Sequence, residues 1–393
     1  ANIQWFNGTY DGNGKKVTNL YIDNTEDKTV GLFGLLGYKG TVKNVTVYGE
    51  VTQNSDRAVA GIVGRNEGII DNCTNYANVT SVTTGASGIS GNHLNTVRNC
   101  VNNGKITGLR KIGGIIGDIG DNSLASNNWS NLPSIVIDNC TNTGEITAIE
   151  SIAGGIAGSS SVDITKCKNT GTVTSNGNPD DAPNTQGTGG IVGRTTANVG
   201  MSSNEGTITS KGSYAGGIIG RGGENTSVGQ CYNKGDIELE QAAGGGIIGC
   251  RAGGGIWNCY NYLSGDKKIK AGVNVGGIMG STGENSTTIE NCYSIGENII
   301  GNSNASILGA YYRDGCVINK CYYISGSSLN GIGTERDGVL AKDNIIAKNL
   351  NDFMLDESNT NSVTYMLKTY NPSLWAQDAN INEGLPYLVN NNR

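Results

Sequence analysis

The stretch GISGNHLNTVRNCVNNGKI, residues 88–106, contains two short signatures that recur along the chain. The first is the tetrapeptide Gly-(Ile/Leu)-X-Gly, which recurs once per repeat in nine repeats and once more in a degenerate form. Successive copies start 26 to 41 residues apart, and most of the intervals lie between 26 and 31. A period of this size is typical of a solenoid whose repeats stack on one another. The copies begin at Gly31, Gly61, Gly88, Gly114, Gly155, Gly190, Gly217, Gly246, Gly277 and, in degenerate form, Ser306.

The second signature, Asn-Cys-X-Asn-X-Gly-X-(Ile/Val), follows each tetrapeptide and keeps step with it. Clear copies stand at 99–106 and 139–146. Because both signatures share one interval, a repeat of about 28 residues is favoured over a chance match. The cysteine position of the signature is occupied by Cys73, Cys100, Cys140, Cys167, Cys231, Cys259, Cys292 and Cys321, and by Val45 and Ser202 in two further copies.

The residue types within one repeat predict strands and turns. Apolar residues come in short runs rich in Val, Ile and Thr, and Gly and Asn separate the runs. No run between residues 15 and 323 has the spacing of a long amphipathic helix. A repeat of two or three short strands cannot bury its own apolar face unless it stacks on its neighbours. We therefore predict an all-β fold, a single right-handed parallel β-helix of about eleven coils with about 28 residues each.

The ends and the insertions divide the chain further. We expect an N-terminal opening coil at 1–29, the β-helix at 30–325, and a last turn with a C-terminal cap at 326–393. The apolar spacing in 343–355 predicts a helix in this cap, which we expect to cover the open end of the last coil. Polar loops are predicted where the interval lengthens, at 119–134, 178–188 and 264–271.

These motifs carry a family resemblance. The recurring GGI-X-G followed by NC-X-N-X-G-X-(Ile/Val) resembles the GLUG-motif family of bacterial surface proteins over about residues 30–325, and the closing stretch 375–388 is similar to the end of such arrays. The resemblance implies a secreted or wall-attached protein. Some GLUG arrays precede the metallopeptidase domain that cleaves immunoglobulin A, and others belong to adhesin-like proteins without an enzyme. It supplies no catalytic residues for these positions.

Composition narrows the classes of function. The chain of 393 residues has 62 glycines and a net charge of −6, so it lacks the basic surface typical of nucleic-acid binding. No stretch of 18 apolar residues is present, and we expect no membrane span. A start at Ala1 without methionine fits a mature or trimmed chain. We expect a monomer within a larger chain.

Of the ten cysteines, the eight at the repeat position are predicted to be free thiols rather than disulfides. Stacking in register places equivalent β-carbons about 4.8 Å apart with parallel bonds, whereas a disulfide needs about 3.5–4.5 Å. The eight repeat cysteines would then form a buried ladder of small apolar side chains. Cys250 and Cys316 lie outside this row, and the sequence leaves their state open.

Metal and cofactor chemistry has little support. His93 is the only histidine, and no HExxH motif is present, so a zinc protease within this chain is excluded. The stretch 11–14 lacks the alternating acids of a calcium loop, and the Gly-rich tetrapeptides lack the Lys-Ser/Thr end of a phosphate loop. We predict no metal, no cofactor and no catalytic residue.

Two features stay open as sites. Paired carboxylates could support polysaccharide cleavage if two of them faced each other, and the candidates are Asp118 with Asp121 and Asp180 with Asp181. The residues after two tetrapeptides, Arg194 and Arg221, are expected to stack. Such a pair either binds an anionic ligand or is neutralised by an acid of this chain, Glu205 or Glu224.

The leading hypothesis is therefore a non-catalytic extracellular β-helix, a spacer, stalk or adhesive module of a bacterial surface protein. Its partners would be host or cell-wall glycans or surface proteins. The alternative is a carbohydrate-active β-helix enzyme, a lyase or glycoside hydrolase, or a glycan-binding module. A groove with paired carboxylates or exposed aromatic residues would favour the alternative, and a smooth surface of Asn, Thr and Ser would favour the first.

Overall fold

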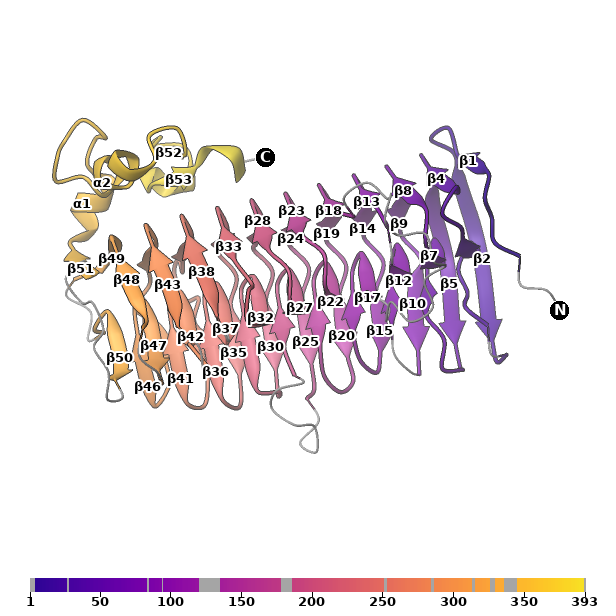
Figure 1. The fold of residues 1–393 in the computed structure, drawn as a ribbon, viewed down its shortest axis with the longest axis horizontal. Coiled ribbons are helices and arrows are strands. Elements are labelled where there is room, and N and C mark those ends of the chain that lie inside the picture. The colour runs from indigo at the N-terminus through magenta and orange to yellow at the C-terminus, as the bar shows by residue number, and fades with distance from the viewer. Residues whose placement is uncertain are drawn as a thin grey trace.

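The chain folds into a parallel β-solenoid, as predicted (Figure 1). The structure is a computed structural model. It describes residues 4–26, 28–82, 85–93, 95–119, 135–177, 186–250, 253–283, 286–312, 315–325, 329–335 and 345–391.

One coil contains five short strands, where the sequence predicted two or three. In the coil of Cys100 these are β13 (Val97–Arg98), β14 (Val101–Asn102), β15 (Ile106–Gly108), β16 (Ile112–Gly113) and β17 (Ile116–Ile119). Each strand is only two to four residues long, and the left-handed residue Asn99 turns the chain between β13 and β14. Runs this short have too few residues to show a strand period in the sequence.

Strands of successive coils pair in parallel and form four sheets in the described part of the chain. Sheet I has eleven strands, from β1 (Thr9–Asp11) to β48 (Val317–Asn319), and sheet IV has eleven, from β3 (Phe33–Leu36) to β50 (Ile332–Glu335). Sheet II has twenty strands in two strips, one of which includes β14 and the other β15. Sheet III has nine strands, from β6 (Val59–Ala60) to β46 (Ser303–Ala305). The eleven strands agree with the predicted number of coils.

The corner between sheets I and II is a left-handed residue after ten of the eleven strands of sheet I. Asn99 and Asn139 have φ of 56° and 52°. Asparagine tolerates this region better than other residues with a β-carbon, which explains the first Asn of the second signature. The equivalent positions with positive φ are Asn44, Asn72, Asn99, Asn139, Lys166, Met201, Gln230, Asn258, Asn291 and Lys320.

The second Asn of that signature forms a buried ladder. The amide nitrogen of Asn102 donates to the amide oxygen of Asn142 over 2.8 Å, and Asn142 donates to Asn169 over 2.8 Å. Both amides also donate to a backbone carbonyl two residues on, Gly104 O and Gly144 O, each at 2.9 Å. The bond from Asn102 to Asn142 shows that coil register is kept on both sides of residues 120–134, which lie outside the described residues. The asparagine ladder consists of Asn75, Asn102, Asn142, Asn169, Asn204, Asn233 and Asn261.

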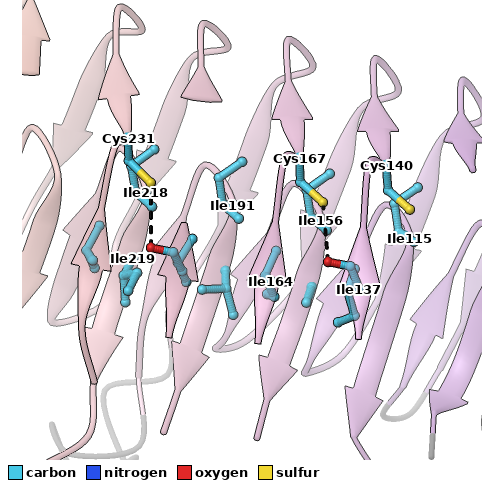
Figure 2. Packing of buried hydrophobic residues seen from close by; sticks show 14 of the residues in the cluster. Ile115, Ile137, Cys140, Ile156, Ile164, Cys167, Ile191, Ile218, Ile219 and Cys231 are labelled. Atoms are coloured by element: carbon cyan, nitrogen blue, oxygen red, sulfur yellow. Dashed lines mark hydrogen bonds between the residues drawn. The ribbon is translucent and has the colours of Figure 1, made fainter. Parts of the chain in front are cut away.

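The main core lies between sheets I and IV and the first strip of sheet II. Cys140 and Ile115 are fully buried in it, as are their equivalents in neighbouring coils. Figure 2 shows Cys140, Cys167 and Cys231 in the same place and orientation in their coils. All ten cysteines are buried and free in the structure, including Cys250 and Cys316, whose state the sequence left open.

The helix predicted in 343–355 is confined to α1 (Leu350–Met354), because Ile345–Lys348 form strand β51, which pairs in parallel with β49 (Cys321–Ile324) of the solenoid. A second helix, α2 (Val363–Tyr370), follows it. Two further strands, β52 (Trp375–Ala376) and β53 (Tyr387–Leu388), pair antiparallel. We call residues 349–391 the terminal segment. It runs back along one side of the solenoid rather than lying across its open end, so the expected position of the cap was wrong (Figure 1).

A column of tyrosines on sheet II explains that position. Tyr232, Tyr260 and Tyr293 stack with ring centroids 4.9 and 5.0 Å apart. Trp375 of the terminal segment packs on this stack, with its centroid 6.2 Å from Tyr260 and 5.8 Å from Tyr293. Asn391 donates to the carbonyl of Gln230 over 2.8 Å. The tyrosines offer an aromatic face on the side of the solenoid, and the terminal segment buries it.

Candidate functional site

The predicted acidic pairs do not form a described site. Asp121, Asp180 and Asp181 lie outside the described residues. Asp118 ends up in β17 with its carboxylate 2.8 Å from the ammonium of Lys111. Burial raises the pKa of Asp118, although Lys111 opposes the shift. Within the part of the chain that the structure describes, Asp118 is thus one half of an ion pair rather than of a carboxylate pair.

The predicted arginine row exists. Arg194 pairs with Arg221 in register on adjacent strands of sheet IV, and Arg221 pairs in turn with Cys250. Both arginines are half-buried. Glu205 does not neutralise them, because it binds Lys168 and Tyr232 on sheet II instead. Among the described residues Glu224 makes no ion pair. Burial raises the pKa of Tyr214, near Cys250 and Arg221, to about 12, so this phenol stays protonated at neutral pH.

A different cluster of chemical groups lies where the terminal segment meets sheet II. We call it the terminal hollow, and it has a volume of about 430 Å³. It combines carboxylates, ammonium groups, a phenol and amides, which come from the solenoid and from the terminal segment. Its lining residues are Glu205, Lys234, Tyr262, Ser264, Lys267, Asn380, Asn382 and Glu383.

The solenoid side of the hollow follows directly from the repeat. Glu205, Lys234 and Tyr262 each come one residue after a member of the asparagine ladder. They therefore occupy one column, with neighbouring strands about 4.8 Å apart. The same column holds Tyr48 and Tyr76 near the N-terminus, whose rings stack at 4.6 Å. Side chains of this column point outward and are free to differ from coil to coil.

The opposite wall depends on Glu383, which accepts a hydrogen bond from the hydroxyl of Tyr262. Glu383 and its neighbour Asn382 have φ of 56° and 53°, two consecutive left-handed residues with a β-carbon. This backbone conformation is unfavourable and persists where surrounding contacts hold it. Here the contacts include bonds from the Asn382 amide to Tyr293 Oη (3.2 Å) and Pro386 O (2.9 Å).

Charges in the hollow are unevenly paired. Burial alone would raise the pKa of Glu205, but bonds of 3.0 Å from Lys168 and from Tyr232 lower it more, and the carboxylate is ionised at neutral pH. Burial lowers the pKa of Lys234 against the attraction of Glu205 and Glu383. Among the described residues its ammonium has no carboxylate within 4.0 Å, and it lies 5.3 Å from the ring centroid of Tyr232. Lys234 is therefore a desolvated cation with free donors.

A second hollow of about 390 Å³ adjoins the first and shares Tyr262, Ser264 and Glu383 with it. Its character is more apolar. The apolar side chains that line it are Leu263, Ile295, Ile324, Leu350, Met354 and Leu385. The hydrogen bond between Tyr262 and Glu383 lies at the boundary, so a polar hollow and a partly apolar one form neighbouring subsites.

Sequence reasoning missed this cluster for a physical reason. Tyr262 and Glu383 are 121 residues apart, and nothing in the repeat pattern tells where the terminal segment docks. One signal was available: Glu205, Lys234 and Tyr262 share one offset from the ladder asparagines in consecutive coils.

Across the described residues no group of three or more His, Cys, Asp or Glu side chains could hold a metal ion. No described helix has the length and apolarity to cross a membrane.

Fold and site together define a repeat protein of the parallel β-solenoid class with a polar hollow on its side. No family model matches the chain, and no solved structure does. A segment of 73 residues, 18% of the chain, is 34% identical to a protein of Evansella cellulosilytica named as a Gly-rich membrane protein, and covers 8% of it. A segment of 124 residues, 31% of the chain, is 32% identical to the halomucin of Haloquadratum walsbyi, and covers 1% of it. The chain thus spans a small part of these relatives.

Proposed function

We propose that this chain is a non-catalytic extracellular module of a longer bacterial surface protein, with GLUG-type repeats that serve as a spacer and adhesive region. The observation that carries the proposal is the use of the recurring residues. Glycines, asparagines and cysteines of both signatures occupy turns, the buried ladder and the core, so the repeat is devoted to building a rod.

The outer surface of sheet II supports this proposal. Six consecutive strands carry a threonine at the same outward position. These side chains are exposed or half-buried and present a row of hydroxyl groups, with Asp23 next to Thr52 and Glu238 next to Thr209 at its two ends. A regular polar surface of this kind suits a rod that stays soluble beside other macromolecules. The threonines are Thr52, Thr80, Thr107, Thr147, Thr174 and Thr209.

The names of the two matched proteins support an extracellular setting. One is named as a Gly-rich membrane protein and the other as halomucin, and both are much longer than the matched segments. In our proposal this chain is likewise a monomeric part of a larger chain, with host or cell-wall glycans or surface proteins as partners. The cysteines are buried and free, and in our proposal they stay reduced and inert in an oxidising environment.

The second candidate is a carbohydrate-active protein, and the terminal hollow favours it. Glu205 and Glu383 line one hollow together with Lys234, a set of groups that can act on or bind a sugar. Glu205 is held ionised by Lys168, however, and a general acid needs a raised pKa. Binding without cleavage therefore fits the groups of the hollow better than hydrolysis.

Surface exposure tests the proposal in cells that produce the longer protein. Antibodies raised against residues 30–325 should label intact cells, and external protease should remove the label. Antibodies to a cytoplasmic protein serve as the control for leakage. Labelling that requires permeabilised cells would contradict an extracellular module.

A further inference from the structure

We propose that the terminal hollow and its apolar neighbour together bind an oligosaccharide that contains N-acetylhexosamine. The inference deepens the proposed adhesive function and rests on it. Two adjoining hollows of about 430 and 390 Å³ differ in polarity and share the Tyr262–Glu383 hydrogen bond as their boundary. A chain of sugar rings with both hydroxyl and acetamido groups presents the same alternation of polar and apolar surface.

Lys234 and Glu205 supply the polar recognition. They stand on adjacent strands about 4.8 Å apart, so one sugar hydroxyl can donate to the carboxylate while its neighbour accepts from the ammonium. Lys234 has donors that no described acid uses, and it is already partly desolvated. A ligand hydroxyl would therefore gain a charge-assisted hydrogen bond without breaking an existing ion pair.

Glu383 supplies the opposite wall. Its left-handed backbone aims the carboxylate back toward the solenoid, where Tyr262 donates to it. A turn with glycine at this position would avoid the strain, yet the chain has a glutamate there and a glycine at the next position, Gly384. Strain of this kind is found where a side chain is held for binding.

The neighbouring hollow supplies the preference for an acetyl group. Leu263, Met354 and Leu385 present methyl and thioether groups around a space that begins at the Tyr262–Glu383 pair. An acetamido group places a methyl next to a polar amide, and the methyl would gain from leaving water here. A hydroxyl in its place would lose hydrogen bonds to water without replacement.

Isothermal titration with two matched sugars tests the inference. Chitotriose carries acetamido groups where cellotriose carries hydroxyls, and both have the same linkage. We expect chitotriose to bind the intact chain about tenfold more tightly, or better. Equal affinities, or no binding of either sugar, would overturn the inference.

Variants locate the binding. Lys234→Met should weaken chitotriose binding about tenfold, the effect of losing one hydrogen bond to a charged group. Met354→Ala should narrow the preference for chitotriose over cellotriose. Lys105→Met removes a lysine of the same sheet far from the hollow and should change nothing. Thermal unfolding checks that each variant is folded.

Two outcomes separate this inference from the proposed function. Chitotriose binding that survives Lys234→Met unchanged would place the sugar elsewhere and refute the assignment of the hollow. If the protein labels intact cells but binds neither sugar, the spacer function stands and only this inference falls. The antibody labelling of intact cells is measured without any sugar.

Discussion

The amide oxygen of Asn142 lies 2.3 Å from the point that a β-carbon on Gly114 would occupy. Gly155 stands in the same relation to Asn169, with the amide carbon at 2.3 Å. The side chain of the ladder asparagine thus occupies the space that a β-carbon on the first glycine of the tetrapeptide would need. This contact explains why the two signatures keep step, since an asparagine at the ladder position requires a glycine at the first position of the tetrapeptide.

Gly114→Ala should therefore unfold the solenoid at a lower denaturant concentration. The new methyl would meet Asn142 and also the carbonyl oxygen of Gly155 at 2.3 Å, and backbone cannot move aside cheaply. We expect a loss of about 3 kcal/mol or more in the free energy of unfolding. Gly229→Ala is the matched control, because its β-carbon would meet nothing nearer than 3.8 Å, and it should change stability by less than about 0.5 kcal/mol. Similar effects of the two substitutions would contradict the role of the contact.

The period, the strand chemistry and the buried cysteines could be predicted because each repeat confronts the same neighbours. A residue such as Cys140 meets its equivalents above and below, so the sequence repeats wherever the structure does. The number of strands per coil was missed since strands of two residues leave no alternation to read. The left-handed corner at Asn99 and the ladder at Asn102 were visible as recurring asparagines, but their different roles were not.

The site could not be predicted in the same way. It depends on one contact between a repeat residue, Tyr262, and a residue of the non-repeating end, Glu383. The docking of that end is decided by Trp375 on the tyrosine column, and no period records it. The acids selected from the sequence, such as Asp118, were chosen because they lie in or near the predicted loops. The residues of the hollow lie instead in the outward column of sheet II, where the coils differ.

Lys166→Asn should stabilise the protein. Lys166 has φ of 53° at the corner where neighbouring coils have Asn139 and other asparagines. Asparagine adopts this region at lower cost, and we expect a gain of about 0.5–1 kcal/mol in the free energy of unfolding. Denaturant titration measures it. Lys105→Asn, at a position without positive φ, serves as the control and should bring no gain. A loss of stability in Lys166→Asn would show that the corner does not select asparagine.

The thiols should be unreactive until the chain unfolds. Burial raises the pKa of Cys100, Cys140 and Cys292 well above the usual range of a thiol, and the thiolate is the reactive form. Titration with a thiol reagent should detect few groups in the native protein and nearly all ten after unfolding without reductant. If no new thiols appear on unfolding, the cysteines are disulfide-bonded.

The same burial predicts loss of stability in alkali. A thiol with a raised folded pKa contributes stability below its unfolded pKa, about 8.5, and that contribution is lost as pH rises above it. Each buried thiol should then cost about 1.4 kcal/mol per pH unit. Cys140→Ser introduces the residue that Ser202 provides at the same position of another coil. It should reduce the loss of unfolding free energy by about 1.4 kcal/mol per pH unit. A pH profile that this substitution leaves unchanged would contradict the assignment.

Trp375→Ala should release the terminal segment without unfolding the solenoid. Trp375 is almost fully buried on Tyr260 and Tyr293, and its removal leaves a large cavity that typically costs about 3–5 kcal/mol. Hydrogen exchange should become faster in 363–391 and stay unchanged in the coil of Cys140. Tyr365→Ala, an exposed ring of the same segment, is the control. Faster exchange throughout the solenoid would mean that the segment is integral to the rod.

The central claim is that this chain builds a rod and does not turn over a substrate. Incubation with a panel of host, cell-wall and plant glycans, followed by detection of new reducing ends and unsaturated products, tests it most directly. We predict that every glycan is recovered intact, including any that binds the terminal hollow. Product formation that disappears in Glu205→Gln or Glu383→Gln, or on replacing Asp118 and Asp121 or Asp180 and Asp181, would contradict the account and establish an enzyme.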